Sequence, residues 1–270
     1  MLKLFIYIAL VVLLIICFIP FLMMIVNATR TNSEILKGFT IIPGSATLEN
    51  YATLIQYMDV WRGFMNSLIV SISVTVLNAY FSALTAFALV VYNFKGKNLI
   101  FVAFIILMMV PGQLGLIGLY DLSATLGMLN TYWPLIIPAI AAPFTVFFFR
   151  QYLITTMHIS LLEAARIDGS SEIYMFHRIV LPVLMPAMAT MGIFTFIGSW
   201  NNYITPLVIL RSPELFTLPV MMGALRGSPV ALNLGAMYLG IAISVVPIMI
   251  AFLFLSRYII SSVSAGAIKG

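Results

Sequence analysis

His158–Pro182 reads HISLLEAARIDGSSEIYMFHRIVLP and separates two apolar stretches, residues 134–157 and 183–210, that are each long enough to cross a bilayer. Both histidines of the chain lie in this segment. Its second half also carries a run of apolar side chains that a merely solvated connector has no reason to expose: Ile173, Tyr174, Met175 and Phe176. The segment, which we call the docking loop, is therefore predicted to bind another protein.

The first half of the docking loop is predicted to be a short helix. Ser160 and Glu163 have the spacing of a capping box, in which the hydroxyl and the carboxylate satisfy the free amides at the start of a helix. The helix is therefore expected to begin near Leu161. Ala164 and Ala165 keep one of its sides thin enough for close approach.

A bend and a second short helix are expected to follow. Gly169 lets the chain reverse, because glycine adopts the backbone conformations that other residues avoid. Ser170 or Ser171 can then cap the second helix. Pro182 is expected to end it, because proline lacks the backbone N–H that a helix interior needs.

The composition excludes a soluble domain. Of the 270 residues, 63% are hydrophobic and only 8% are charged. Apolar windows of about 20 residues, the length that crosses a hydrocarbon core, occur six times, at residues 4–26, 65–91, 99–120, 134–157, 183–210 and 234–257. The first is longer than the apolar region of a signal peptide and is expected to be a retained span. The chain is thus predicted to be an all-α membrane protein with one domain of six spans.

Basic residues near the ends of spans predict the orientation, because cationic loops stay in the cytoplasm. With the N-terminus inside, the cytoplasmic side receives eight basic residues: Lys3, Lys95, Lys97, Arg150, Arg166, Arg178, Arg257 and Lys269. The outer side receives five: Arg30, Lys37, Arg62, Arg211 and Arg226. Both termini, the docking loop and the tail 258–270 are therefore predicted to be cytoplasmic, and the loop 211–232 to be external. Topology explains the basic balance, so no nucleic-acid partner is expected.

Residues that would carry chemistry are missing. No Asp, Glu, Lys or His falls inside a predicted span, although an ion-coupled transporter usually keeps such groups at membrane depth. The sequence has no HExxH motif, one lone cysteine (Cys17) and no GxxxxGK[ST] phosphate loop. Catalytic residues, a metal site, a cofactor and ATP hydrolysis by this chain are therefore not expected. Any energy for transport must come from a partner.

Two groups of polar residues lie within the predicted spans. Small polar residues recur on one helical face of the second span, at Ser71, Thr75, Asn78, Ser82 and Thr85. The fifth span holds a denser cluster, Ser199, Trp200, Asn201, Asn202 and Tyr203, near the middle of its window. Each group is consistent with helix packing or an interfacial aromatic belt, and also with contact to a solute. Amides and aromatic rings would suit a sugar.

Prolines are expected to bend most of the spans, because each one frees a backbone carbonyl. They are Pro20, Pro111, Pro138, Pro143, Pro206 and Pro247. A full break of the helix is expected at Pro111-Gly112-Gln113.

The docking loop resembles the signature of permease subunits of ATP-binding-cassette (ABC) importers, namely E-A-A, three residues, G, nine residues and I-x-L-P. The matching residues are Glu163, Ala164, Ala165, Gly169, Ile179, Leu181 and Pro182. The whole chain is similar to the carbohydrate branch, and most of all to the maltose-type second permease subunit. The further likeness rests on Asn66-Ser67, on 126–131 (LGMLNT), on Trp200-Asn201 and on 265–270 (AGAIKG). Asn202 departs from the acidic residue that is frequent there.

This resemblance implies the fold of type I ABC importer permeases in the cytoplasmic membrane of a prokaryote. It implies that the docking loop inserts into a cytoplasmic ATPase through Glu163, Ala164, Ala165, Asp168, Gly169, Ile173, Phe176, Ile179, Leu181 and Pro182. It places Gly266, Lys269 and Gly270 of the tail at the ATPase interface. It also implies that the outer loop meets an extracytoplasmic solute-binding protein at Gly223, Gly227 and Pro229.

The implied assembly holds two ATPase copies, which bind ATP and Mg, and a second permease subunit that is a different chain. The implied function is the import of a sugar or oligosaccharide. Residues Trp200, Asn201, Asn202, Tyr203, Asn78 and Ser82 are then candidates for the substrate path. Alternatives are an ABC importer of a polyol, a glycerol phosphate or a peptide, an ATP-independent transporter or channel, and a membrane-embedded enzyme.

Overall fold

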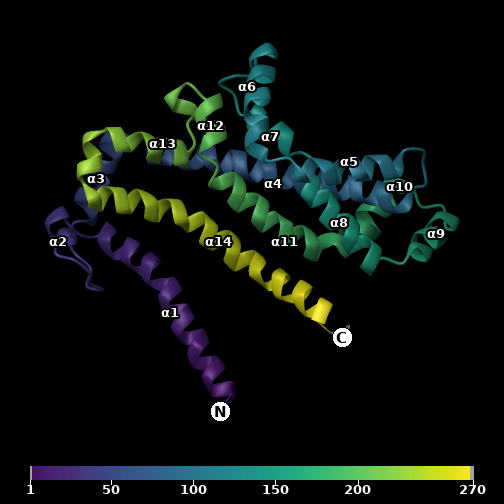
Figure 1. Ribbon diagram of the computed structural model, residues 1–270, viewed down its shortest axis with the longest axis horizontal. Helices are drawn as coiled ribbons and strands as arrows, with labels where there is room; N and C mark the ends of the chain where they lie inside the picture. The colour runs from purple at the N-terminus through teal and green to yellow at the C-terminus, as the bar shows by residue number, and fades with distance from the viewer. Residues whose placement is uncertain (1, 268–270) are drawn as a thin grey trace. The chain divides into compact units, whose positions relative to one another are not determined.

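The computed structural model describes residues 2–267, apart from the side chains of residues 2, 231 and 255–267. Across the described residues all regular elements are helical, as the sequence predicts (Figure 1). The chain forms two compact units. Unit 1 combines Met1–Met65 with Thr217–Ile248, and unit 2 combines Asn66–Phe216 with Met249–Gly270.

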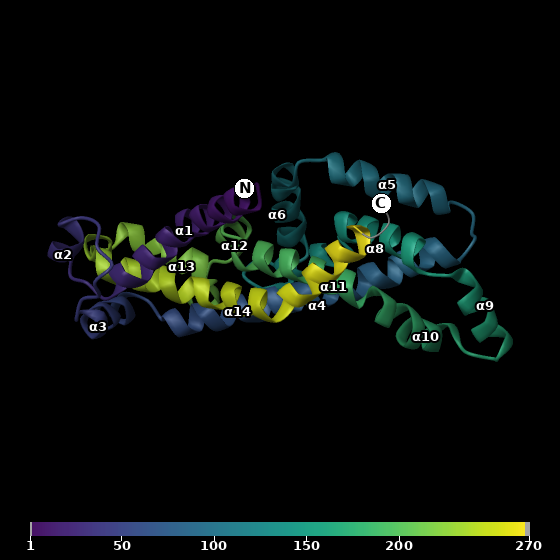
Figure 2. The same ribbon diagram turned by 90° about the horizontal axis from the view of Figure 1, so that it is seen from below.

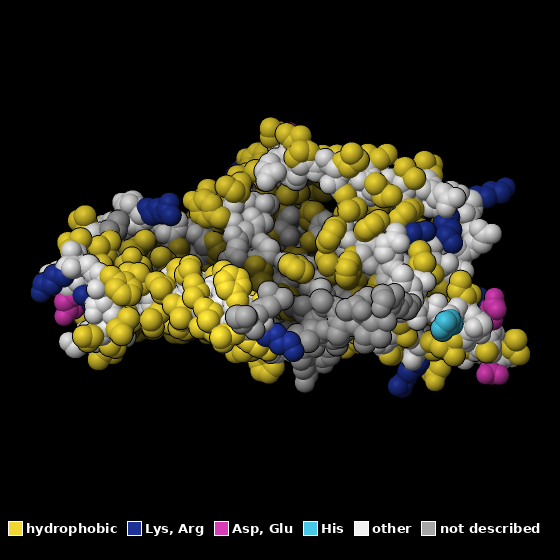
Figure 3. Space-filling model, turned by 60° about the horizontal axis from the view of Figure 1, so that its bottom comes forward, with side chains coloured by type: hydrophobic (Ala, Val, Ile, Leu, Met, Phe, Trp, Pro, Cys, Tyr) yellow, Lys and Arg dark blue, Asp and Glu magenta, His cyan; other side chains and the backbone are white. Residues whose placement is uncertain are grey.

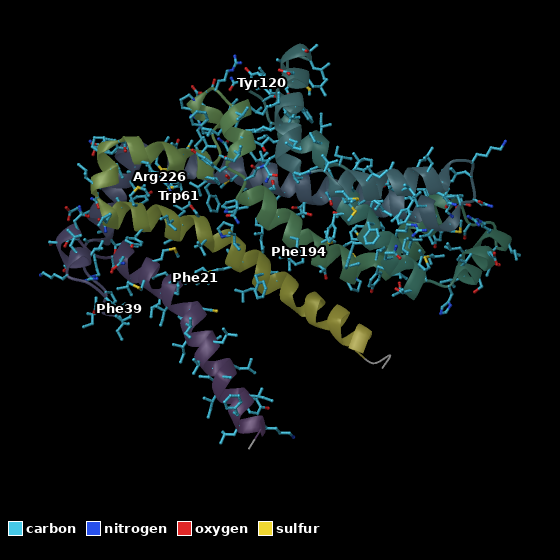
Figure 4. The ribbon with its side chains drawn as sticks, viewed as in Figure 1. Phe21, Phe39, Trp61, Tyr120, Phe194 and Arg226 are labelled. Atoms are coloured by element: carbon cyan, nitrogen blue, oxygen red, sulfur yellow. The ribbon has the colours of Figure 1, made fainter. Side chains whose placement is uncertain are left out.

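Unit 1 combines the N-terminal part of the chain with a later segment, Thr217–Ile248. It contains α1 (Leu2–Ala28), α2 (Asn32–Leu36), α3 (Thr47–Tyr57), the first residues of α4 (Val60–Val91), α13 (Leu218–Ala224), the 3-10 turns Leu225–Gly227 and Pro229–Leu232, and the first part of α14 (Leu234–Ala267). In α3 and the start of α4 the side chains of Tyr51 and Trp61, the latter labelled in Figure 4, form a 2.9 Å hydrogen bond from the indole N–H to the phenol.

Buried polar side chains hold unit 1 together where α1 ends. The amide of Asn50 donates to the backbone carbonyls of Ala28 at 2.9 Å and Arg30 at 3.0 Å. Gly235 of α14 packs directly on this junction, since a Cβ there would lie 2.4 Å from the Arg30 carbonyl oxygen and 2.4 Å from the Asn50 amide nitrogen. Asn32 also binds α14, because its side-chain carbonyl accepts the N–H of Leu234 at 2.7 Å. The hydrogen bond between Asn32 and Leu234 joins residues 202 positions apart in the sequence.

Unit 2 contains the rest of α4 and the middle of the chain. Its elements are α5 (Lys97–Met109), a 3-10 turn (Gly112–Leu114), α6 (Gly115–Thr125), α7 (Trp133–Ile136), a 3-10 turn (Ile137–Ala139), α8 (Pro143–Thr156), α9 (Ile159–Ile167), α10 (Glu172–Met175), a π-helical turn (Phe176–Val180), α11 (Leu181–Trp200), α12 (Ile204–Ile209) and a 3-10 turn (Pro213–Leu215). α8 packs against both α5 and α11 (Figures 1 and 2).

The core of unit 2 lies where α4, α8, α11 and the docking loop meet. Its fully buried members include Phe87, Phe149, Leu162, Phe176 and Leu184. Fully burying such a side chain is worth about 1.5–3 kcal/mol. Four residues of the docking loop, Leu162, Met175, Phe176 and Val180, therefore help to hold the unit together.

The helices long and apolar enough to span a membrane overlap all six predicted windows, but the helix of the fifth window, Glu172–Trp200, begins and ends earlier than predicted. Within the described residues five helical stretches qualify: Lys3–Ala28, Val60–Val91, Trp133–Thr156 (α7, the 3-10 turn and α8), Glu172–Trp200 (α10, the π-helical turn and α11) and Leu234–Phe254. The third window corresponds to Lys97–Met109 and Gly112–Thr125, which are bent by 89°. The break expected at Pro111-Gly112-Gln113 is thus confirmed. A total of six spans, and both termini in the cytoplasm, stay predictions.

The predicted end of the fifth span is wrong. α11 ends at Trp200, and the remaining residues of the 183–210 window form the separate short helix α12. Asn201 and Asn202 favour turns over helix interiors, and Pro206 cannot donate the backbone hydrogen bond that a continuous helix requires. Pro206 is accordingly part of α12 and does not bend the fifth span.

Candidate functional site

The first arm of the docking loop is a helix, but it does not begin with the predicted capping box. α9 begins at Ile159, with His158 at the N-cap and no side-chain cap. Ser160 therefore lies inside the first turn. The first residue of α9 is set by its apolar face, because the helix must be placed so that Leu162 is buried in the core of unit 2. Glu163 and Ala164 stay exposed, as a partner-binding role requires.

A shallow cleft runs beside α9. It encloses about 440 Å³ and is lined mainly by apolar side chains, among them Met157, Leu161, Ala164 and Val183. Ala164 contributes to its wall, as expected for a residue that leaves room for close approach. Ala165, on the neighbouring position, is half-buried against the core.

The bend has the geometry of a Schellman motif, as the glycine predicts. Asp168 is the C-cap, and Gly169 adopts a φ of +79°. The N–H of Gly169 donates to the carbonyl of Arg166 at 3.0 Å, and the N–H of Ser170 donates to the carbonyl of Ala165 at 2.9 Å. Asp168 and Gly169 are both exposed.

The second arm begins with a serine cap and does not end at the proline. The hydroxyl of Ser171 accepts the N–H of Tyr174 at 3.3 Å, which confirms the cap. α10 then continues through the π-helical turn into α11, so the predicted stop at Pro182 is wrong. Pro182 lies in the first turn of α11. A π-helical turn changes the local pattern of backbone hydrogen bonds. The helix therefore continues past the turn, although a proline lies in the first turn of α11.

The four apolar residues of the second arm divide between surface and core. Ile173 is 73% exposed and Tyr174 is 54% exposed, whereas Met175 and Phe176 are buried. Phe176 does not present its ring at the surface: the ring packs 5.5 Å from that of Phe87, centroid to centroid. The helical period explains this, because consecutive residues point to different faces. A direct contact between Phe176 and the partner stays a prediction.

The remaining residues of the signature lie at the base of the loop. Ile179 and Leu181 are half-buried against the core, and Pro182 is exposed. An exposed residue that the sequence did not single out is Ile167, at 87% exposure. Ile167 and Ile173 thus present apolar side chains on the two arms. Figure 3 shows acidic, basic and histidine side chains around the part of unit 2 that carries α9 and α10.

The docking loop contains a charged cluster that was not predicted from the sequence. Arg166 Nε lies 2.8 Å from Glu172 Oε1, and Arg166 Nη2 lies 3.1 Å from Glu172 Oε2. The hydroxyl of Tyr92, just past the end of α4, donates to the same Oε2 atom. Burial and this carboxylate raise the pKa of the Tyr92 hydroxyl, so it remains a donor. The hydrogen bond to Glu172 raises the pKa of Arg166. No helical spacing links residues 166 and 172, because the bend at Gly169 brings them together.

The predicted solute cluster lies at the end of a helix and not near the middle of a span. Trp200 is the last residue of α11, is 1% exposed and stacks on Phe196 at 5.8 Å between centroids. Asn201 and Tyr203 are exposed, and Asn202 is half-buried with its side chain accepting the N–H of Thr205 at 3.3 Å. Because α11 spans about 30 Å, the cluster lies a full span length from Leu181. The expected mid-span position is therefore corrected to a helix terminus.

Three residues of the polar stripe in the second span, Ser71, Asn78 and Ser82, are buried in the packing of unit 2. Asn78 is 2% exposed and donates to the backbone carbonyl of Ala139. Ser71 donates to the carbonyl of Ser67 at 2.7 Å, within its own helix. Ser82 is fully buried, and its hydroxyl has no hydrogen-bond partner among the described atoms. The packing interpretation of Asn78 therefore fits the structure, and a role in the solute path stays a prediction.

The other predicted contact residues lie away from the docking loop in the sequence. In unit 1, Gly223 falls within α13 and is half-buried, whereas Gly227 and Pro229 are exposed. Arg226, labelled in Figure 4, is exposed beside them. The backbone of Gly266 continues α14, and Lys269 and Gly270 lie outside the described residues. Among the described residues no group of three or more His, Cys, Asp or Glu could hold a metal ion.

Comparisons with known proteins cover nearly the whole chain. Residues 78–265 match the family model of the binding-protein-dependent transport system inner membrane component. The chain is 39% identical over 255 residues to the arabinooligosaccharides transport system permease protein AraQ of Halalkalibacterium halodurans, covering 93% of this chain and 91% of that protein. It is 35% identical over 205 residues to the sn-glycerol-3-phosphate transport system permease protein UgpE of Salmonella typhi, covering 73% of each.

A solved structure has a similar fold. It is described as the crystal structure of a bacterial ABC transporter involved in the import of the acidic polysaccharide alginate. The TM-score is 0.81 at 20% sequence identity, and the match covers 95% of this chain and 97% of that one.

Proposed function

This chain belongs to the family of binding-protein-dependent transport system inner membrane components, and on that premise we propose that it is a permease subunit of an ABC importer for oligosaccharides. The observation that carries the sugar class is the 39% identity to an arabinooligosaccharide permease over 93% of the chain. Oligosaccharides of arabinose are the first substrates to test. The chain is a transport subunit and not an enzyme.

The docking loop is the proposed contact with a cytoplasmic ATPase. It offers a charged helix face with Glu163, a glycine bend and exposed apolar side chains at Ile167 and Ile173. Protein interfaces combine an apolar core with a polar rim, and the docking loop offers both apolar and charged side chains. ATP and Mg would bind to the partner, because this chain has no phosphate loop. Closure of two ATPase copies would then move the spans between inward- and outward-facing states.

A second permease subunit is proposed to complete the pore. One docking loop serves one ATPase, and two ATPases face each other, so a related permease chain would supply the second loop. On the outer side a solute-binding protein would deliver the sugar. The exposed Gly227 and Pro229 in the loop 211–232 are the proposed contact with it.

Glycerol phosphate is the second candidate substrate, because of the likeness to UgpE. An anionic solute would favour a cationic side chain on its path. Arg150 lies within the fourth span, but its guanidinium sits 3.8 Å from the ring centroid of Phe101 on α5, an arrangement typical of a cation packed on an aromatic face. This favours a neutral sugar over the phosphate ester.

Purification of the tagged chain from its host tests the assembly. We expect an ATPase, a second permease and a solute-binding protein to accompany the wild-type chain. Glu163→Lys should abolish recovery of the ATPase, whereas Glu49→Lys, an exposed change in α3, should not. Uptake measurements then separate the two substrates. They compare labelled arabino-oligosaccharide with labelled glycerol phosphate in a strain that lacks the gene, with and without a plasmid copy of it. A homo-oligomer without an ATPase would contradict the proposal.

A further inference from the structure

Three residues from different parts of unit 2 meet where the docking loop joins α4. Arg166 comes from the last turn of α9, Glu172 is the first residue of α10, and Tyr92 immediately follows α4. The carboxylate of Glu172 receives two hydrogen bonds from the guanidinium, at 2.8 and 3.1 Å, and one from the phenol. The guanidinium also lies over the Tyr92 ring, 5.7 Å from its centroid. We call these three residues the joint.

The two charged residues of the joint are each placed where the charge suits the helix. Glu172 lies at the N-terminus of α10, and Arg166 lies near the C-terminus of α9, so both complement the helix dipoles. The bidentate geometry also fixes the orientation of the two arms, because two parallel hydrogen bonds restrict rotation where a single bond does not.

Tyr92 extends the joint into the membrane helices. The ammonium group of Lys97, at the start of α5, donates to the backbone carbonyl of Tyr92 at 2.9 Å and to that of Val90 at 3.4 Å. Lys97 thereby satisfies carbonyls that the end of α4 leaves free. The backbone of Tyr92 is held by α5 while its side chain holds Glu172. A continuous set of contacts therefore runs from the bend of the docking loop to the ends of α4 and α5.

The joint contributes little to holding the fold. The side chains of Arg166 and Glu172 are 35% and 44% exposed, and ion pairs with that much access to water add little stability. The buried rings of Phe87 and Phe176 and the buried Leu162 already fasten the loop to unit 2. The contact adds little stability, but it is bidentate and joins three elements. It is therefore best suited to fixing the angle between the two arms of the docking loop and the end of α4.

We propose that Arg166, Glu172 and Tyr92 are positioning residues that make α4 follow the docking loop when the ATPase closes. The proposal rests on the proposed function, since it requires an ATPase on the loop. With the joint intact, movement of the bend turns α9, α10 and the end of α4 together. Without it, the loop rotates about its buried base and part of the movement is lost before it reaches the spans.

The test measures transport and ATP hydrolysis together in the assembled importer, reconstituted in vesicles with its solute-binding protein. Tyr92→Phe removes one hydroxyl and keeps the ring, and Glu172→Gln removes the charge. Each should retain the ATPase during purification but lower the number of sugars imported per ATP by about fivefold, the lower end of coupling between sites in proteins. Tyr152→Phe is the matched control, because Tyr152 is a half-buried tyrosine of α8 whose hydroxyl has no hydrogen bond among the described residues.

The double variant identifies the shared contact. If Tyr92 and Glu172 act through one hydrogen bond, Tyr92→Phe combined with Glu172→Gln should be no worse than the stronger single change. Wild-type stoichiometry in both single variants would overturn the proposal. So would loss of ATPase binding by Glu172→Gln with normal stoichiometry in Tyr92→Phe, because that pattern assigns the cluster to binding. Failure of the wild-type chain to recruit any ATPase would instead contradict the proposed function.

Discussion

The rings of Phe87 on α4 and Phe176 in the docking loop lie 5.5 Å apart and are both buried. The base of the docking loop is thus part of the core of unit 2, and only its outer residues are free to meet a partner. This division separates residues whose loss should destabilise the fold from residues whose loss should weaken binding.

Phe176→Ala should therefore lower the stability of the chain itself. Replacing a buried phenylalanine by alanine costs about 3–5 kcal/mol, and Phe176 is 1% exposed. Thermal unfolding of the purified chain in detergent measures the effect. Ile173→Ala, at 73% exposure, should leave the unfolding temperature unchanged and weaken binding to the ATPase. The reverse pattern would show that the core assignment is wrong.

Gly169→Ala should misalign the two arms of the docking loop. A φ of +79° costs a residue with a Cβ about 1–2 kcal/mol, although no atom lies within 4 Å of the position that the Cβ would take. We expect on the order of a tenfold weaker ATPase affinity, measured by titration of the detergent-solubilised subunit. Gly198→Ala is the control, because that glycine is helical and also has open space around it. Equal affinities for the two variants would refute this expectation.

Trp200 and Asn201 are adjacent in sequence but should respond differently to substitution. Trp200→Ala removes a ring that is 1% exposed and should cost about 3–5 kcal/mol of stability. Asn201→Ala changes an exposed side chain at the end of α11 and should keep stability while altering the KM for sugar uptake. Thermal unfolding and uptake kinetics of both variants check this. An unchanged KM for Asn201→Ala would remove that residue from the proposed solute path.

Asn78→Ala should destabilise unit 2 because it leaves the carbonyl of Ala139 without its donor. An unsatisfied buried polar group costs about 1–3 kcal/mol. Ser82→Ala should be neutral or slightly stabilising, since the hydroxyl of Ser82 is buried and has no partner among the described atoms. Unfolding temperatures of the two variants provide the comparison. A larger loss for Ser82→Ala than for Asn78→Ala would contradict the packing interpretation of the stripe.

Much of the docking loop could be predicted from its sequence. The glycine bend and the Ser171 cap depend on backbone rules that act over a few residues, and both are present. The capping box at Ser160 and the stop at Pro182 were wrong, because burial of Leu162 and the π-helical turn outweighed the local signals. The contact between Arg166 and Glu172 has no sequence signal, since it depends on the angle between two helices.

The sequence by itself determined that this chain is helical and belongs in a membrane, because the length and apolarity of each span follow from uninterrupted runs of apolar residues along the chain. It also located the break in the third span and the loop that carries the family signature. The tertiary structure alone decided which side chains of that loop are available. Phe176 is withdrawn into the core while Ile173 is exposed, because packing against α4 selects one face of the helix and local sequence rules do not specify the partner helix.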